Sequence, residues 1–309
     1  MSVPSPYVSI IIPCFNAEQY IADTIRSAQQ QTYPHKEVIV IDDGSSDGSV
    51  EILKSFADSI TWETGPNRGA CAARNRGLQL AKGERIQFLD ADDWLYPQKL
   101  ERQIECIRQH PNSTPVCDWE VNEPGQTPKR VPAPSTSDDP LLSLLYGPLQ
   151  TSSPLHNRAD LTRIGGFRED LPCSQERDLH LRLASYGWPI HRIAEPLYAV
   201  RRVAGSVSGN YERVLDQHAG IAHRIREILV SRDAWNDTSA RHVAGFLTRD
   251  ARAYINLGLD AKADRYFSLA REYHKSGGWD LAYGRLTRLG ATILGPVTLE
   301  KLRLRLRRK

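Results

Sequence analysis

Residues 85–97 read RIQFLDADDWLYP, and this stretch indicates both the fold and a site. The apolar run at 86–89 has the composition of a buried strand and leads directly into DADD at 90–93. One aspartate here would be typical of a helix N-cap, since helix-like text follows. Three carboxylates so close together repel one another, and burial raises that cost unless a cation or hydrogen-bond donors compensate. The sequence therefore indicates more than a cap at this turn.

Strand-like and helix-like patterns alternate around this stretch over the first 120 residues. The strand-like runs occupy 7–13, 37–43, 59–64, 85–90 and 114–121, and the helical patterns occupy 18–30, 49–56, 69–81 and 97–109. Such alternation predicts an α/β fold of the Rossmann-like type, a mostly parallel sheet with helices on both faces. Ligands bind such sheets at the carboxyl ends of the strands, near a change in strand order. Both DADD and IDDGSSDGS, residues 41–49, stand at that edge.

The later part of the chain reads differently. Residues 121–140 are rich in Pro, Ser, Thr and charge, which predicts a surface loop. From about residue 210 the text is helical, with one tetratricopeptide-like hairpin pattern at 249–274 and no second copy at a 34-residue period. We therefore expect an α/β domain at 1–210, divided into a nucleotide half (1–120) and an acceptor half (121–210). An all-helical extension with a basic tail should follow at 211–309.

Composition excludes several classes of protein. The 309 residues are 40% apolar and 25% charged, as in ordinary globular proteins, and they contain no apolar run of 18 residues. The first residues lack a signal-peptide pattern, so we expect a cytoplasmic protein. Five scattered cysteines without a CxxC pair indicate neither a disulfide framework nor a zinc site. Six cationic residues of 301–309 exceed the net charge of +3, so the body is slightly acidic and no nucleic-acid partner is expected.

The DADD turn has the chemistry of a metal site for a nucleoside diphosphate. Carboxylates alone would repel a diphosphate, whereas Mg²⁺ or Mn²⁺ held by hard oxygens bridges to the phosphates. The D-x-D spacing lets Asp90 and Asp92 approach the same side. Such a metal would stabilise the charge that builds on a diphosphate leaving group.

Two further groups of residues fit the same ligand. Asp42 and Asp43 end the second strand, where a carboxylate can accept hydrogen bonds from a nucleobase N–H or a ribose hydroxyl. The segment NRGACAARNRGL places Arg68, Arg74 and Arg76 near the sheet edge, ready for phosphate, although one of them is expected only to cover a helix face.

The segments at 7–49, 67–78 and 86–100 resemble the family 2 glycosyltransferases of the inverting GT-A class in motif order and spacing. The resemblance implies transfer of a sugar from a nucleotide-sugar donor, with UDP-sugars favoured, and usually with Mg²⁺ or Mn²⁺. It implies a metal-binding D-x-D at Asp90 and Asp92, with Asp92 the more direct ligand. The residues that we assign to the donor are Pro13, Asn16, Asp42, Asp43, Arg74, Asp90, Ala91 and Arg201.

The resemblance continues through GGFREDLPCSQERDLHLRLASYG at 165–187. In this family a Gly-Gly-Phe turn precedes a helix of the E-D-x-D-L-x-x-R type that carries the catalytic base. The alignment places Glu176 at the base position, whereas Gln175 replaces the neighbouring acid. Glu176 would take the proton of the acceptor hydroxyl, and Asp178 would orient the turn. Without this motif, Glu176 would be read as a helix first-turn carboxylate favoured by the helix dipole.

Two segments later in the chain each allow more than one interpretation. The segment VRRVAGSVSG at 200–209 keeps Arg201, Ser206 and Ser208 of a family loop that closes over the diphosphate, but Val203 stands where a histidine is usual. The tail at 299–309 places leucines among cations, which suits either an anionic membrane surface or a solvated end. Liposome flotation with and without these residues tests membrane contact at the inner face.

The sequence thus predicts a metal-dependent inverting glycosyltransferase with a glycan or lipid-linked acceptor, acting in cell-envelope or extracellular glycan synthesis. A nicotinamide oxidoreductase is excluded because PCFNAE at 13–18 replaces G-x-G-x-x-G. An aspartyl phosphatase is disfavoured because WLYP, rather than small residues, follows the D-x-D. A non-catalytic glycan-binding or scaffold protein of the same fold stays open, supported by Gln175 and Val203.

Overall fold

The fold is built around strand β1 (Val8–Cys14), and all seven residues of this strand are buried. A strand with helices over both faces reads as a continuous apolar run, as VSIIIPC does. The computed structural model describes residues 5–134, 139–145, 149–171, 174–202, 211–283 and 296–307. The chain divides into two units, Met1–Ser206 and Val207–Lys309. Strand β1 is the central strand of a five-stranded sheet in the first unit.

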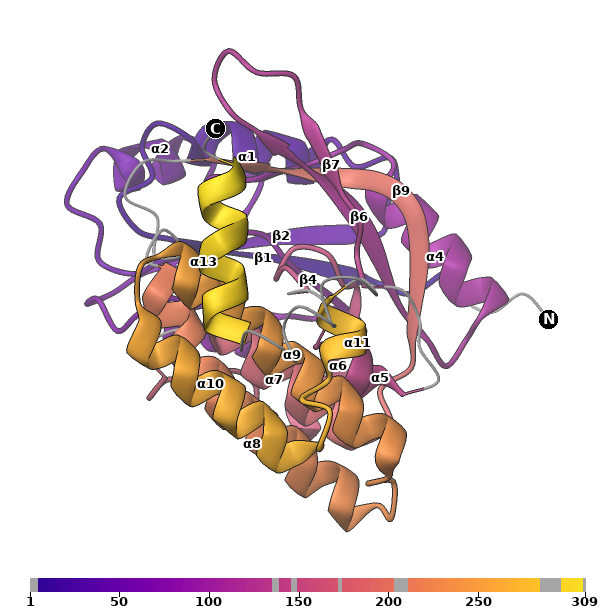
Figure 1. Cartoon of the computed structure of the whole chain (residues 1–309). Helices are drawn as coiled ribbons and strands as arrows, with labels where there is room; N and C mark the ends of the chain where they lie inside the picture. The colour runs from indigo at the N-terminus through magenta and orange to yellow at the C-terminus, as the bar shows by residue number, and fades with distance from the viewer. Residues whose placement is uncertain are drawn as a thin grey trace. The chain divides into compact units, whose positions relative to one another are not determined.

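This first sheet has the strand order β3-β2-β1-β4-β8. Figure 1 labels its three central strands, β2, β1 and β4. Strand β1 pairs in parallel with β2 and β4, β2 pairs in parallel with β3, and β8 is antiparallel to β4. The order reverses between β1 and β4, so the carboxyl ends of β1, β2 and β4 share one edge at the switch point. The new strands are β2 (Lys36–Asp42), β3 (Thr61–Thr64), β4 (Arg85–Phe88) and β8 (His156–Asn157).

Helices α1 (Ile21–Gln29), α2 (Ser49–Ser55) and α3 (Ala70–Leu80) connect the parallel strands. Because such crossovers are right-handed, the reversal of strand order puts α1 and α2 on one face and α3 on the other. Helix α3 packs very closely on β1. A Cβ at Gly77 would lie 2.3 Å from Ile11 Cγ2, so only glycine permits this approach. The close contact fixes the position of every side chain that α3 sends toward the sheet edge.

A second sheet in the same unit has the order β5-β9-β6-β7. The strands β6 and β9 run parallel, and β5 and β7 are antiparallel edge strands. We expected the run at 114–121 to be a fifth strand of the first sheet. It forms β6 in the second sheet instead, because it pairs with the distant strand β9. The bounds are β5 (Trp94–Leu95), α4 (Lys99–Gln109), β6 (Thr114–Asn122), β7 (Lys129–Val131), α5 (Pro140–Ser143), α6 (Arg158–Arg163), α7 (Gln175–Ser185) and β9 (Ile190–Arg201).

The second unit is helical where the structure describes it. Helices α9 and α10 form the expected hairpin, which turns at Gly258 with a φ of +77°. The predicted fold class, an α/β body with an all-helical C-terminal extension, is confirmed. Within the described ranges, no helix combines the length and apolar composition needed to cross a membrane. The helices are α8 (Tyr211–Ser231), α9 (Asp237–Asn256), α10 (Asp260–Tyr273), α11 (Trp279–Ala282) and α13 (Pro296–Arg307).

A fully buried lysine joins the two sheets of the first unit. The ammonium group of Lys99, on α4, donates to the side-chain oxygen of Gln103 at 2.7 Å and to that of Gln87 on β4. It also lies 3.3 Å from the carbonyl oxygen of Ser153. Burial lowers the pKa of Lys99 to about 8. The cation is retained in the core because several acceptors replace its hydration shell.

Two buried histidines stack on one tryptophan. The rings of His156 and His180 lie 5.7 and 5.2 Å from the ring of Trp188, centroid to centroid. None of the four imidazole nitrogens has a hydrogen-bond partner within the described part of the chain. Burial, with the charge of Lys99 as a second cause, lowers the pKa of His156 to about 3. Burial also holds the pKa of His180 well below its usual range.

This stack makes stability depend on pH. The unfolded chain takes up protons at these histidines below a pKa of about 6.5 while the native chain does not, so stability falls with pH from about 6.5 toward 3. We expect His156→Phe, which keeps an aromatic ring, to reduce the pH slope of the free energy of unfolding by about 1.4 kcal/mol per pH unit between pH 6 and 4. Urea unfolding at several pH values measures this slope. His35→Phe, at an exposed position, is the control; equal slopes for wild type and His156→Phe would contradict the prediction.

Candidate active site

The acidic turn stands where β4 ends, beside β1. The Leu89 N–H still donates to the Ile11 carbonyl oxygen at 3.0 Å, and the chain then turns so that the Asp93 N–H reaches the Asp90 carbonyl oxygen at 3.1 Å. The Thr24 hydroxyl lies 2.8 Å from the carbonyl oxygens of both Ala91 and Asp93. This hydroxyl fixes the turn to the first helix of the unit.

A buried arginine compensates one of the three carboxylates. Arg74 projects from α3, and its Nη2 donates to Asp90 Oδ1 at 2.6 Å. The guanidinium also lies over the ring of Phe167, 5.3 Å from the ring centroid. Arg74 is only 8% exposed, whereas the Asp90 side chain keeps about a third of its surface open to solvent. The structure brings together these two residues that we assigned to the donor, and they contact each other.

At the other two carboxyl groups of the turn the charged form is disfavoured. Burial, and then the charge of Asp90, raises the pKa of Asp92. Asp93 is buried, and the same causes, together with Asp92, raise its pKa well above the usual range. Its Oδ1 accepts a hydrogen bond from the Arg201 N–H at 3.2 Å, which ties the turn to the end of β9. We had given Asp93 no role; the third aspartate of DADD was the available signal.

Two aromatic rings hold the side chain of Arg201 beside this turn. Its guanidinium lies 4.6 Å from the centroid of Tyr20 and 5.2 Å from that of Trp94. Its charge also slightly lowers the pKa of Asp92. The arginine therefore stands at the acidic turn, as phosphate contact requires. The positions Val203, Ser206 and Ser208 of the predicted closing loop lie outside the described residues.

At the end of β2, the two aspartates make different contacts. Asp43 accepts the N–H groups of Arg68 and Gly69 at 2.7 and 2.8 Å, so both of its oxygens organise the turn before α3. Asp42 Oδ2 accepts from the Thr64 hydroxyl at 2.6 Å. Asp42 Oδ1 is buried and has no hydrogen-bond partner in the described part of the chain. Of the four oxygens, this one is the acceptor that the protein itself leaves unused.

The remaining donor candidates lie at the same edge. Pro13 is buried in β1 opposite Ile41. Asn16 adopts a φ of +48°, and its side-chain oxygen accepts the Ser46 N–H at 2.8 Å, so it joins the loops that follow β1 and β2. Cys14 follows Pro13 at the end of β1. Burial and then the charge of Asp42 raise the pKa of its thiol to about 12.

The Gly-Gly-Phe turn joins this edge to α7. Asn75, the residue after Arg74, accepts the Phe167 N–H at 2.8 Å and donates to the Phe167 carbonyl oxygen at 2.9 Å. Gly166 has a φ of +69°, and a Cβ there would lie 2.5 Å from Asn75 Oδ1. This turn therefore needs glycine both for its backbone conformation and for the close approach of Asn75, a positioning residue that sequence reasoning did not find.

A clasp on α7 fixes the helix that carries Glu176. Arg182 donates to Asp178 Oδ2 at 2.8 Å, to the Ile164 carbonyl oxygen at 2.7 Å and to the Gly166 carbonyl oxygen at 2.8 Å. This agrees with the expected orienting role of Asp178. Glu176 is half-buried in the first turn of α7, and its negative charge acts on Arg74. The carboxylate therefore lies within electrostatic reach of Arg74.

The carboxylates of the acidic turn suit a divalent cation that is coordinated by the protein and by a substrate together. Asp90 and Asp92 supply hard carboxylate oxygens with excess negative charge, but Asp90 already pairs with Arg74. Within the described ranges, no group of three or more His, Cys, Asp or Glu side chains is arranged to hold a metal ion by itself. Mg²⁺ is commonly bound by one or two carboxylates together with substrate phosphates. The residues present fit that arrangement and not a complete protein cage.

Residues 9–162 match the model of the family described as Glycosyl transferase family 2. A putative teichuronic acid biosynthesis glycosyltransferase, TuaG, of Bacillus subtilis is 32% identical over 216 residues, which is 66% of this chain and 82% of that protein. Uncharacterized glycosyltransferases of Haemophilus influenzae and Rickettsia felis are 41% and 33% identical over 38% and 62% of this chain. The chain spans about half and about a third of their respective lengths.

Solved structures share the fold at low identity. TarS residues 1–349 of S. aureus, crystallised with UDP-GlcNAc, superpose with a TM-score of 0.70 and 18% identity over 98% of this chain and 92% of that one. The mannosyltransferase PcManGT of Pyrobaculum calidifontis, in complex with GDP-Man and Mn²⁺, gives 0.56 and 16% over 96% and 86%. The predicted GT-A fold is confirmed by these neighbours.

The clasp on α7 leads to a stability prediction. Replacing Arg182 with alanine leaves the buried Asp178 carboxylate and two carbonyl oxygens without this donor, so we expect a loss of about 2–4 kcal/mol in the free energy of unfolding. Urea denaturation of the full chain measures it. Arg168→Ala, which removes an exposed pair with Asp170, is the control and should cost about 1 kcal/mol or less. Equal losses in both variants would show that the clasp does not hold the helix.

Proposed function

This chain belongs to the family 2 glycosyltransferases, and from that premise we propose that it transfers a sugar from a nucleoside diphosphate sugar to an acceptor hydroxyl, inverting the anomeric configuration. The observation that supports the proposal is that Arg74 and Arg201 both contact the acidic turn, which contains Asp90 and Asp92, while Glu176 lies within electrostatic reach of Arg74. Aspartates that can hold a cation, arginines that can bind phosphate and a glutamate that can accept a proton suit a ligand that carries phosphates and a reacting sugar. Such ligands bind at a strand switch point.

The donor nucleotide would lie along the ends of β1 and β2. The unused Oδ1 of Asp42 would accept a hydrogen bond from a base N–H or a ribose hydroxyl, while Asp43, Asn16 and Pro13 shape the surface around it. Arg74 and Arg201 would face the diphosphate, with Arg74 shared between Asp90 and the phosphates. UDP is favoured because the TarS structures contain UDP-GlcNAc and UDP, although PcManGT contains GDP-Man.

We propose that Asp90 and Asp92 hold Mg²⁺ or Mn²⁺ together with the diphosphate. When bound, the cation would neutralise the negative charge of the leaving group. The raised pKa of Asp92 supports this placement, because among the described residues that carboxylate has no ion pair comparable to the one between Arg74 and Asp90. PcManGT supplies a precedent for Mn²⁺ in the fold.

Glu176 is the proposed general base. It would take the proton of the acceptor hydroxyl as that oxygen attacks the anomeric carbon from the face opposite the diphosphate. The clasp between Arg182, Asp178 and the Gly-Gly-Phe turn would hold Glu176 relative to Arg74. Gln175 beside it carries no charge, so no neighbouring carboxylate competes for the proton at that position.

The acceptor is proposed to be a growing envelope or extracellular glycan, free or lipid-linked. TuaG, whose name refers to teichuronic acid biosynthesis, supports this class. Contact of residues 299–309 with a membrane stays a prediction, because the side chains of Leu302 and Leu306 lie outside the described residues.

Metal-dependent nucleotide binding is the first test. We expect UDP with Mn²⁺ to raise the melting temperature, and chelation or Asp92→Asn to remove most of the shift; at 100 times the dissociation constant the ligand would add about 2.7 kcal/mol. Differential scanning fluorimetry against UDP, GDP, ADP and CDP also identifies the base. Asp58→Asn, an exposed carboxylate after α2, is the control. A shift that chelation leaves unchanged would contradict the metal site, and no shift with any nucleotide would favour the non-catalytic alternative.

Glu176→Gln tests the base without knowledge of the acceptor. Water replaces the acceptor in slow hydrolysis of a UDP-sugar, and we expect release of UDP to fall by about 10²–10⁴-fold, the usual contribution of a general base. The UDP-induced melting shift should not change, because the side chain keeps its size and the metal site is intact. Glu51→Gln, on the exposed face of α2, should hydrolyse the donor at the wild-type rate. Undiminished hydrolysis by Glu176→Gln would remove Glu176 from this role.

A further inference from the structure

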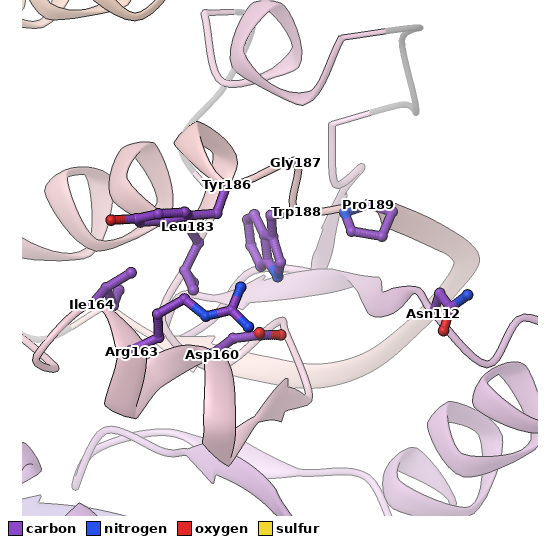
Figure 2. Close-up of a pocket in the computed structure, with 9 residues that line it drawn as sticks. All are labelled: Asn112, Asp160, Arg163, Ile164, Leu183, Tyr186, Gly187, Trp188 and Pro189. Carbon is purple, nitrogen blue, oxygen red and sulfur yellow. The ribbon is translucent and has the colours of Figure 1, made fainter.

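A second concave site lies at the opposite end of β9 from the acidic turn. A cavity of about 270 Å³ is formed where α6 ends, where α7 ends and where the chain enters β9. Figure 2 shows the residues that line it. Tyr186 directly follows α7, and Trp188 precedes β9. Asp160 and Arg163 come from α6, and Asn112 comes from the segment before β6. All of these residues belong to the first unit.

One wall of the cavity is aromatic and accessible. Tyr186 is 64% exposed, and it is one of few large apolar side chains left open to solvent in the described ranges. The guanidinium of Arg163 lies over its ring, 5.9 Å from the centroid. Figure 2 shows the Arg163 side chain extending toward Trp188. An exposed aromatic face backed by a cation and a buried indole offers a flat surface that is already fixed in position.

The polar side chains of the cavity have hydrogen-bonding groups that the described part of the chain does not use. Among the residues that the structure describes, the side chains of Asn112, Asp160 and Arg163 form no hydrogen bond and no ion pair; Asp160 acts only through its charge on the partly buried Arg85. The cavity therefore presents a carboxylate acceptor, a guanidinium donor and an amide that can do both.

These groups together select a class of ligand. A purely anionic ligand would face Asp160, and a purely cationic one would face Arg163. An apolar ligand would remove both charges from water without hydrogen bonds, which is costly. A sugar ring has an apolar C–H face for Tyr186 and hydroxyls that donate to Asp160 and accept from Arg163. The volume is slightly below that of sites for drug-sized ligands, which suits a single sugar ring.

We propose that this cavity is a second carbohydrate-binding site, which holds a sugar unit of the acceptor glycan away from the catalytic edge. The proposal rests on the proposed function for its biological ligand. The twelve-residue strand β9 joins the two sites and spans on the order of 35 Å. A long acceptor could occupy both sites at once, and the linkage would raise its effective concentration at the catalytic edge. Short acceptors would gain nothing.

Ligand-observed NMR tests binding directly. The probes are methyl glycosides of hexoses, N-acetylhexosamines and hexuronic acids, with the donor site filled by UDP and the diamagnetic ion Mg²⁺. We expect at least one class to bind, and Tyr186→Ala and Arg163→Ala each to weaken that binding by about tenfold or more. Tyr186→Phe should retain most of the binding because the ring is kept. Hexuronides binding better than hexosides would assign the sugar contact chiefly to Arg163, within the same site.

The chain offers a matched control. Arg26 lies over the ring of Phe56 at 5.8 Å, an arginine–aromatic pair on the surface of the same unit but away from this cavity. Arg26→Ala should bind the glycoside as wild type does. Binding that Tyr186→Ala and Arg163→Ala leave unchanged, or no binding of any glycoside while UDP still binds, would overturn the proposal. Glycoside binding at this cavity without nucleotide binding would keep the second site and reject the transferase function.

Discussion

Repulsion among Asp90, Asp92 and Asp93 is the constraint on which the first unit depends. Three carboxylates within four residues would not remain at a buried strand end unless cations were brought to them. The fold supplies Arg74 from α3 and Arg201 from the end of β9. Arg74 reaches the turn because α3 packs directly on β1, where Gly77 has no Cβ to clash with Ile11. Electrostatic compensation and close packing are therefore one requirement.

Consecutive residues of α3 serve two parts of the site. Arg74 faces the acidic turn, while Asn75 binds the backbone of Phe167 on both its N–H and its carbonyl oxygen. The turn that Asn75 holds is the one that Arg182 grips from α7. A displacement of α3 would consequently move the donor edge and the helix carrying Glu176 together. The geometry between the two halves of the site is set by backbone contacts and not by the charged groups alone.

Sequence patterns were informative where a local signal exists. The apolar run of β1, the DADD turn and the alternation of strands and helices predicted an α/β sheet with its acidic residues at one edge, and the structure places them there. They could not show which strands pair, so β6 was assigned to the wrong sheet. They also could not show that Asp43 is occupied by the N–H groups of Arg68 and Gly69, because such contacts depend on a loop conformation that periodicity does not encode. The cavity beside Tyr186 has no motif at all, since its residues come from three separate segments of the chain.

The thiol of Cys14 can report on motion at the proposed donor site, where β1 and β2 end. Its pKa of about 12 and its complete burial mean that almost no thiolate exists at neutral pH and that none is within reach of a reagent. Alkylation of Cys14 therefore requires the loops after β1 and β2 to separate. The rate of its modification would therefore report how often the loops separate. A nucleotide that holds the loops together would lower the alkylation rate of Cys14, and no label has to be introduced to measure it.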